Sequence, residues 1–114
     1  MFRFISLVKN EILFLFGRLD FKYRYMQEWP DISAIPERTV IIVGSKEKTK
    51  WALLKCPCGC QDVLNLSLMK SVSPNWRTII DKTERITLEP SLWKNGGCRS
   101  HFFIRRGKII WCSE

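Results

Sequence analysis

Two groups of thiols are the residues in this chain that are best suited to chemistry. Residues 56–60 read Cys-Pro-Cys-Gly-Cys, and the proline and glycine favour a sharp turn that brings the three thiols together. A fourth thiol, Cys98, precedes His101, the only histidine of the chain. Two short ligand groups on separate turns are typical of tetrahedral Zn²⁺ sites. The predicted ligands of Zn²⁺ are Cys56, Cys58, Cys60, Cys98 and His101.

The number of protein ligands decides whether such a metal ion is structural or catalytic. Four ligands close the coordination sphere, whereas three leave room for a water molecule whose pKa falls to about 7. A catalytic ion also needs a general base, for which Asp62 and Glu89 are candidates, and Ser91 and Ser100 could orient a substrate or act on an oxyanion. The predicted catalytic residues are therefore Glu89, Ser91 and Ser100. Taken singly, each carboxylate fits a surface position and Ser91 fits a turn or helix cap equally well.

The thiol groups need a scaffold, and the hydrophobic pattern predicts a small antiparallel β-sheet. Strands are expected at 39–44, 51–55, 62–69, 77–80, 85–88, 102–104 and 108–111. The second and third of these resemble a hairpin whose tip carries the first three thiols. A flexible Asn-Gly-Gly turn at 95–97 delivers Cys98 and His101. Residues 89–93 are expected to end the ladder, because Pro90 donates no hydrogen bond.

The register of the last hairpin decides whether Cys112 can join the metal site. A two-residue loop at Arg106 and Gly107 would place Cys112 opposite His101. A three-residue loop with a bulge would pair His101 with Trp111 and turn Cys112 away. Arginine suits the left-handed first position of the tighter turn badly, so we expect the bulged loop, which disfavours Cys112 as a ligand.

The N-terminal residues 1–25 are predicted to form an amphipathic helix. One face gathers apolar residues at helical spacing, namely Phe4, Ile5, Val8, Ile12, Leu15, Phe16 and Leu19. The polar residues 9–11 interrupt the apolar run before it reaches the roughly 20 residues that span a bilayer. We therefore expect no transmembrane span, and a helix that packs on the sheet or docks a peripheral partner or membrane. The predicted organisation is a helical arm over residues 1–30 and a zinc-binding β domain over residues 39–114, a mainly β (α+β) fold.

Composition narrows the setting in which the protein works. The chain has 114 residues, 46% of them hydrophobic, and a formal net charge of +8. This charge fits nucleic acid, an anionic membrane or an acidic protein partner. Five cysteines with Cys-x-Cys spacing suit metal binding in a reducing compartment better than disulfides, so we expect a cytoplasmic protein.

Several motifs, taken together, resemble a small bacterial domain family whose members occur beside ubiquitin-like conjugation genes. The motifs are Cys-Pro-Cys-Gly-Cys at 56–60, Trp76, Thr-Leu-Glu-Pro-Ser-Leu at 87–92, Cys-Arg-Ser-His-Phe at 98–102, Gly107 and Trp111. The resemblance covers about residues 39–112. It implies a zinc-dependent peptidase that trims or removes a ubiquitin-like protein, with the five predicted ligands at the metal and Ser91 and Ser100 near it. The family often has glycine after the third thiol, where this chain has Gln61.

Two other functions are compatible with the same residues. The first is a non-catalytic, zinc-stapled module that binds a protein partner. The second is nucleic-acid binding, because cations near the predicted metal site alternate with aromatic rings, as stacking surfaces often do. These residues are Arg99, Arg105, Arg106 and Lys108, with Phe102, Phe103 and Trp111.

Overall fold

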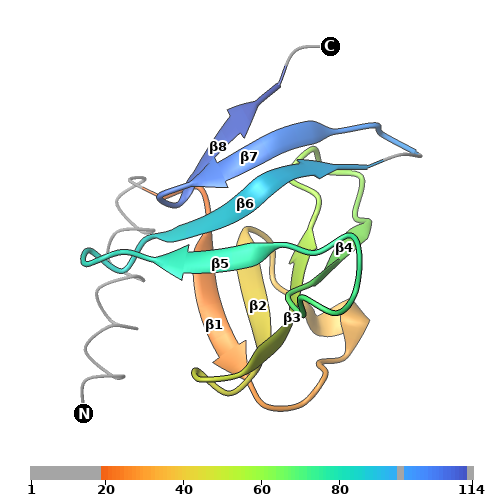
Figure 1. Cartoon of the computed structure of the whole chain (residues 1–114). Helices are drawn as coiled ribbons and strands as arrows, with labels where there is room; N and C mark the ends of the chain where they lie inside the picture. Colours follow the sequence, from red (N-terminus) through yellow and green to blue (C-terminus); the bar gives the residue numbers. More distant parts are fainter. Residues whose placement is uncertain (1–18, 95–96, 113–114) are drawn as a thin grey trace.

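The computed structural model describes residues 19–94 and 97–112, which form two four-stranded sheets (Figure 1). The first sheet contains β1 (Lys22–Met26), β2 (Thr39–Gly44), β3 (Thr49–Lys55) and β4 (Val63–Ser67). The second contains β5 (Arg77–Ile80), β6 (Ile86–Trp93), β7 (His101–Arg105) and β8 (Lys108–Trp111). The prediction of a mainly β fold is confirmed, and the helical content of the described residues is one 3₁₀ turn, η1 (Ile32–Ala34). In that part of the chain, no helix has the length and apolar content to cross a membrane.

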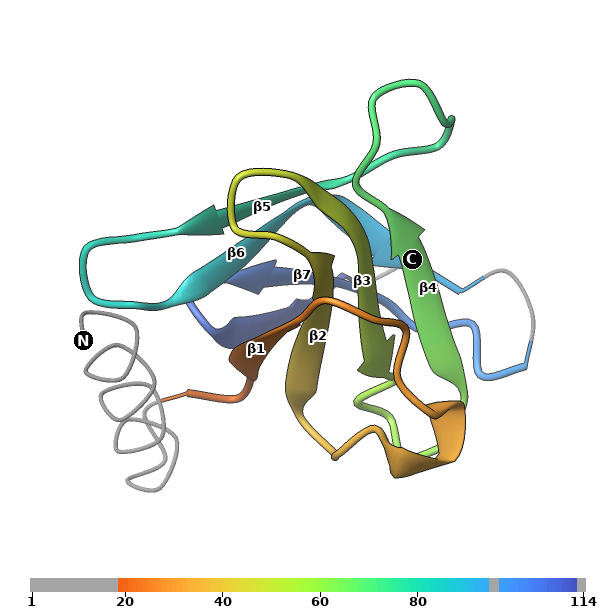
Figure 2. The same ribbon diagram turned by 90° about the horizontal axis from the view of Figure 1, so that it is seen from below.

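The hydrophobic core lies between the two sheets. Strand residues alternate between the two faces of a sheet, and the apolar ones on the facing sides pack together (Figures 1 and 2). The first sheet contributes Phe21, Tyr23, Val40, Ile42, Ala52, Leu54 and Leu66, and the second contributes Ile86, Leu88, Leu92, Phe102 and Ile104.

The outer faces of the two sheets differ. The outer face of the first sheet is covered, because Ile35 packs there in a second buried cluster with Ile41 and Leu53. The outer face of the second sheet carries exposed apolar side chains instead. Ile79 is 41% exposed, Trp93 56% and Ile110 41%. The second sheet therefore presents an open face.

The prediction of a helix over residues 1–25 is wrong at its C-terminal end, and residues 1–18 lie outside the described residues. Residues 22–26 form β1, which pairs in parallel with β2, so the first sheet is not purely antiparallel. The physical reason is tertiary: Phe21 and Tyr23 are buried in the core between the sheets, and the N–H groups of Asp20 and Phe21 both donate to the Gly107 carbonyl. The aromatic alternation of this segment suits a pleated strand better than a helix.

The predicted end of the ladder at Pro90 is also wrong, since β6 runs on to Trp93. The strand accommodates the missing N–H by an irregularity in its pairing with β7. Leu88 pairs with Ile104, but Leu92 pairs with Phe102, so β6 contains extra residues at this point. Both leucines point into the core. By alternation, Ser91 and Trp93 on either side of Leu92 lie on the open face.

The last hairpin has the tighter of the two predicted loops. Arg105 pairs with Lys108, and the two loop residues Arg106 and Gly107 both have left-handed backbones, with φ of 48° and 77°. The conformation of Arg106 is held by its surroundings, because its N–H donates to Thr87 Oγ1 at 2.9 Å and its Nε donates to Asp81 Oδ2 at 3.1 Å.

This register corrects the prediction for Cys112. Because Phe102 pairs with Trp111, Cys112 lies opposite His101 and is not turned away from it. The Cys112 N–H donates to the His101 carbonyl at 2.9 Å. Cys112 nevertheless does not belong to the group of thiols that gathers elsewhere in the described residues.

Candidate functional site

The first thiol group sits at the tip of the β3–β4 hairpin, as predicted. Lys55 pairs with Val63, and the connection between them is closed by the Cys56 N–H, which donates to the Asp62 carbonyl at 2.8 Å. Gly59 has a φ of 94°, which only glycine adopts readily. The tight turn leaves Cys56 buried and brings the two later thiols of the tip to the surface.

The fourth thiol lies on the loop that joins β6 to β7. The Lys94 N–H donates to the Ser100 carbonyl at 2.9 Å and closes this loop, which carries Cys98. The Lys94 ammonium forms an ion pair with Asp62 at 2.6 Å between Nζ and Oδ2. This ion pair joins the two thiol-bearing loops, and it engages the carboxylate that was one candidate general base.

The two loops bring four sulfur atoms together. Cys56 Sγ lies 3.4 Å from Cys58 Sγ and 3.6 Å from Cys98 Sγ, and Cys60 Sγ lies 3.6 Å from Cys98 Sγ. All four sulfurs lie within 4.8 Å of one another. Tetrahedral Zn²⁺ with Zn–S bonds of about 2.3 Å separates its sulfur ligands by about 3.8 Å. We call these four residues the thiol cluster, and its donor set fits one tetrahedral metal ion.

Ser100 belongs to the surroundings of the thiol cluster. It is buried, and its Oγ lies 3.4 Å from Cys56 Sγ and 3.1 Å from Cys98 Sγ. Hydrogen bonds from the Ser100 hydroxyl and the Ser100 N–H lower the pKa of the Cys98 thiol to about 6. Burial raises the pKa of Cys56 to about 12. The structure thus places this predicted catalytic serine against the sulfurs, where a hydroxyl can stabilise a thiolate.

His101 lies outside the thiol cluster and hydrogen bonds elsewhere. Its Nε2 is 2.9 Å from Ser91 Oγ. The contact follows from the sheet register: Trp93 pairs with His101, so Ser91 is the diagonal neighbour of His101 on the open face. The indole of Trp93 stacks on the imidazole with ring centroids 4.3 Å apart and planes 14° from parallel. A hydroxyl in hydrogen-bond contact with an imidazole is the arrangement of a nucleophile and its general base.

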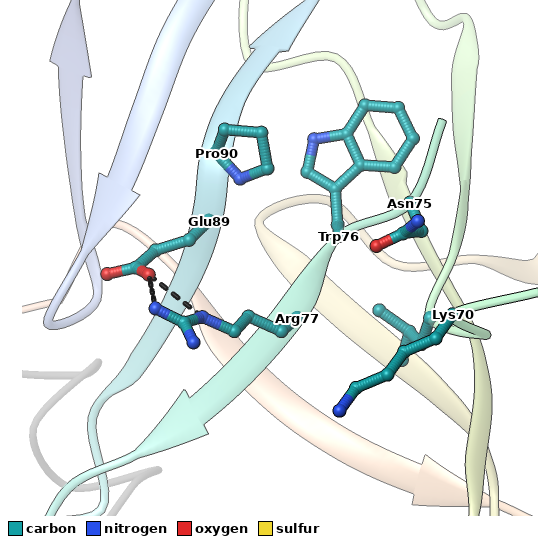
Figure 3. A pocket seen from close by; sticks show the side chains of 7 residues that line it. Lys70, Asn75, Trp76, Arg77, Glu89 and Pro90 are labelled. Atoms are coloured by element: carbon teal, nitrogen blue, oxygen red, sulfur yellow. Dashed lines mark hydrogen bonds and ion pairs between the residues drawn. The ribbon is translucent and has the colours of Figure 1, made fainter. Parts of the chain in front are cut away.

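Glu89 precedes Ser91 by two residues on β6 and forms an ion pair with Arg77. The Arg77 Nε donates to Glu89 Oε2 at 3.0 Å. Both side chains line a cavity of about 580 Å³, together with Pro90 and Trp76 (Figure 3). The Trp76 indole N–H donates to the Ser91 carbonyl at 3.2 Å. The structure therefore brings Glu89 to the wall of a cavity beside Ser91.

The predicted basic and aromatic patch is partly engaged within the fold. The guanidinium of Arg105 lies 4.4 Å from the centroid of the Phe103 ring, and Arg106 is paired with Asp81. Phe102 is fully buried in the core. Of the seven residues in the patch, these four are engaged within the fold and do not offer the free stacking surface that the sequence suggested.

Sequence reasoning placed Ser91 and His101 near one metal ion and missed their contact with each other. The signal was present in the sequence spacing. A hairpin centred on Gly97 pairs Trp93 with His101, and it then brings Ser91 to the same face. The expected strand end at Pro90 concealed this pairing.

Comparison with known proteins gives one result. A search of curated proteins found no match, and neither did a search of solved structures. A family model described as "Bacterial ubiquitination-like system serine protease (BubE)" matches residues 25–112, which include both thiol loops and the Ser91–His101 contact. The resemblance to a domain family of bacterial ubiquitin-like systems is thereby confirmed. This chain belongs to the BubE family, which is named for a protease of a bacterial ubiquitination-like system.

Proposed function

We propose that this chain is a serine peptidase that cleaves a ubiquitin-like protein from a C-terminal extension or from its conjugates. Ser91 is the nucleophile and His101 is the general base. The observation that carries the proposal is the 2.9 Å contact between Ser91 Oγ and His101 Nε2. The family description, which names a serine protease, supports the same chemistry.

In the proposed reaction, His101 Nε2 carries the proton from Ser91 Oγ to the leaving group. Ser91 Oγ attacks the scissile carbonyl carbon while its proton passes to His101 Nε2, and the carbonyl electrons move onto oxygen. When the tetrahedral intermediate collapses, the C–N bond breaks and the imidazolium returns the proton to the leaving amine. Water then hydrolyses the Ser91 ester, with the same imidazole as base. Ser91 and His101 thus act in both halves of the reaction.

The pair is oriented by the sheet and by stacking. The Trp93 ring stacks on the imidazole and restricts its rotation. The backbone pairing of Trp93 with His101 fixes the position of His101 along the sheet. Among the described residues, no carboxylate is hydrogen-bonded to His101, and Glu89 is paired with Arg77. We therefore describe the pair as a Ser-His dyad, in which the stacked Trp93 orients the plane of the imidazole but accepts no hydrogen bond from it.

The thiol cluster is assigned a structural Zn²⁺. Its four sulfurs supply all the ligands of a tetrahedral ion, whereas a catalytic zinc keeps a position for water. When bound, the ion supplies folding free energy by cross-linking the two loops. This assignment replaces the zinc-activated water of the peptidase implied by sequence resemblance. Thiolate-rich ligation favours zinc over magnesium or calcium.

Cleavage of a fusion protein tests the proposal. The substrate is a ubiquitin-like protein of a bacterial ubiquitination-like system, joined through its C-terminus to a fluorescent protein. The masses of the cleavage products are measured by mass spectrometry. We expect the wild-type chain to release the two parts and Ser91→Ala to leave the fusion intact. Ser71→Ala, which changes an exposed serine, is the matched control and should cleave like the wild type. Equal cleavage by Ser91→Ala would contradict the proposal.

A further inference from the structure

The cavity of about 580 Å³ adjoins the proposed nucleophile. It is lined by Leu68, Lys70, Asn75, Trp76, Arg77, Glu89 and Pro90. Its size lies within the roughly 300–1,000 Å³ of typical ligand pockets. Figure 3 shows Glu89 and Pro90 on one side, Lys70 and Asn75 on the other, and Trp76 and Arg77 between them.

Covalent and hydrogen-bonded links tie this cavity to the dyad. Pro90, part of its wall, directly precedes Ser91, and Trp76 donates its indole N–H to the Ser91 carbonyl. Because Pro90 of the cavity wall adjoins Ser91 in the chain, a side chain next to the scissile bond is the part of a bound substrate that is best placed to enter the cavity.

The walls of the cavity combine apolar surface with an excess of positive charge. Leu68, Trp76 and Pro90 supply the apolar part. Arg77 donates from both Nε and Nη2 to the same Glu89 oxygen, so the charges of these two side chains compensate each other. The remaining guanidinium N–H groups are available to a ligand. Lys70 is exposed and forms no ion pair or hydrogen bond with any residue that the structure describes.

We propose that this cavity is a substrate subsite that selects an acidic side chain close to the scissile bond. Its aliphatic stem packs on Trp76 and Pro90, and its carboxylate pairs with Lys70. A basic side chain would meet only Glu89, whose charge Arg77 already compensates. The net charge of +8 adds attraction for an acidic partner over longer distances. The inference rests on the proposed peptidase function, because it assigns the cavity to the same substrate.

A charge-reversal experiment tests the selectivity. Internally quenched peptides with Glu, Gln or Lys at each position flanking the cleaved bond are compared by kcat/KM. At one flanking position, the wild type should prefer Glu over Lys by about fivefold, the scale of one partly exposed ion pair. Lys70→Glu should reverse this preference, and Lys70→Gln should abolish it. Lys46→Glu, which makes the same charge change on the exposed β2–β3 loop, should keep it.

The outcomes separate this inference from the proposed function. If wild type and Lys70→Glu show the same preference while Ser91→Ala is inactive, the subsite is wrong and the dyad stands. If Ser91→Ala cleaves as well as the wild type, the dyad itself is wrong. If no peptide is cleaved, binding of the same peptides to Ser91→Ala is measured by fluorescence anisotropy. A Glu preference lost in Lys70→Glu supports the subsite, and equal binding of all three peptides overturns it.

Discussion

The thiol cluster and the Ser91–His101 pair are built differently, although Cys98 of the cluster is only three residues before His101. Ser100 is buried against the sulfurs, while His101, the next residue, lies on the open face of the second sheet and contacts Ser91. The thiol cluster is made of loops, whereas the dyad is made of strands. Consecutive side chains along an extended backbone point to opposite faces of a sheet, so residues that look like one site in sequence form two sites in space.

We propose different roles for the two regions. A metal ion at the thiol cluster joins the β3–β4 loop to the β6–β7 loop, and the latter leads directly into His101. In the function that we propose, the dyad provides the chemistry, and a metal ion at the thiol cluster acts on catalysis only through the backbone, by holding the strand that carries the base.

The largest effect is expected from breaking the dyad. Ser91→Ala and His101→Gln should each lower kcat/KM by about 10³-fold or more, because nucleophile and base act as a unit. For the same reason, the double variant should be no slower than the slower single variant. Steady-state kinetics on the fusion substrate check this, and multiplied losses in the double variant would show that the two residues act independently.

Removal of the metal should affect stability and activity together. Cys98→Ser, or a chelator applied to the wild type, should lower the melting temperature by about 10 °C or more, since 1 kcal/mol corresponds to roughly 4–8 °C in a domain of this size. Cys112→Ser makes the same chemical change outside the thiol cluster and should leave the melting temperature unchanged. A chelated protein that keeps its melting temperature but loses activity would indicate a catalytic metal.

A smaller effect is expected from the ring that stacks on the base. Trp93→Leu should lower kcat by about threefold to tenfold, the scale of one aromatic stacking contact, with KM little changed. Because the Trp93 side chain is 56% exposed, the melting temperature should stay near that of the wild type. Calorimetry and kinetics on one preparation separate these outcomes. A parallel fall in stability would assign Trp93 to the fold, not to the dyad.

The smallest effect lies far from both regions, at Asp81. Burial opposes its charged form, but hydrogen bonds from the Thr83 hydroxyl, the Arg85 N–H and Arg106 outweigh this and lower the pKa of Asp81 to about 2. Because the folded pKa lies below the ordinary value near 4, the carboxylate stabilises the fold above about pH 4. That contribution, about 1 kcal/mol after discounting for exposure, is lost as the pH falls toward 2.

Asp81→Asn should therefore lower the free energy of unfolding at pH 7 and narrow the difference between pH 7 and pH 3. Urea unfolding at both pH values measures it. The rate of fusion cleavage at pH 7 should not change, since Asp81 contacts neither region. An equal loss of stability at both pH values would show that hydrogen-bond geometry, not charge, is what matters at this position.

The sequence was a good guide to the thiol cluster and a poor one to the dyad, for physical reasons. Cys56, Cys58 and Cys60 lie on a local turn whose proline and glycine are readable residue by residue. The contact between Ser91 and His101 depends on strand register across a loop and on an irregularity that lets β6 continue past Pro90. Register is a property of the paired strands, and propensities of single residues do not encode it.

The last hairpin illustrates the same limit. The left-handed backbone of Arg106 is unfavourable by itself, and its residue type therefore predicted the longer loop. Contacts with Thr87 and Asp81, both on other parts of the sheet, stabilise the tighter turn. Likewise, β1 was concealed because its burial depends on the parallel strand beside it.

We propose that the dyad performs covalent catalysis while the metal ion does not take part in the reaction. The most direct test is the reaction of the zinc-loaded protein with a fluorophosphonate, which forms an Oγ–P bond and releases fluoride at an activated serine. Peptide mass mapping should find one adduct, at Ser91, formed equally in Ser100→Ala and absent in His101→Gln. An unlabelled Ser91 in a protein that still cleaves its substrate, or an adduct at Ser100, would contradict the account.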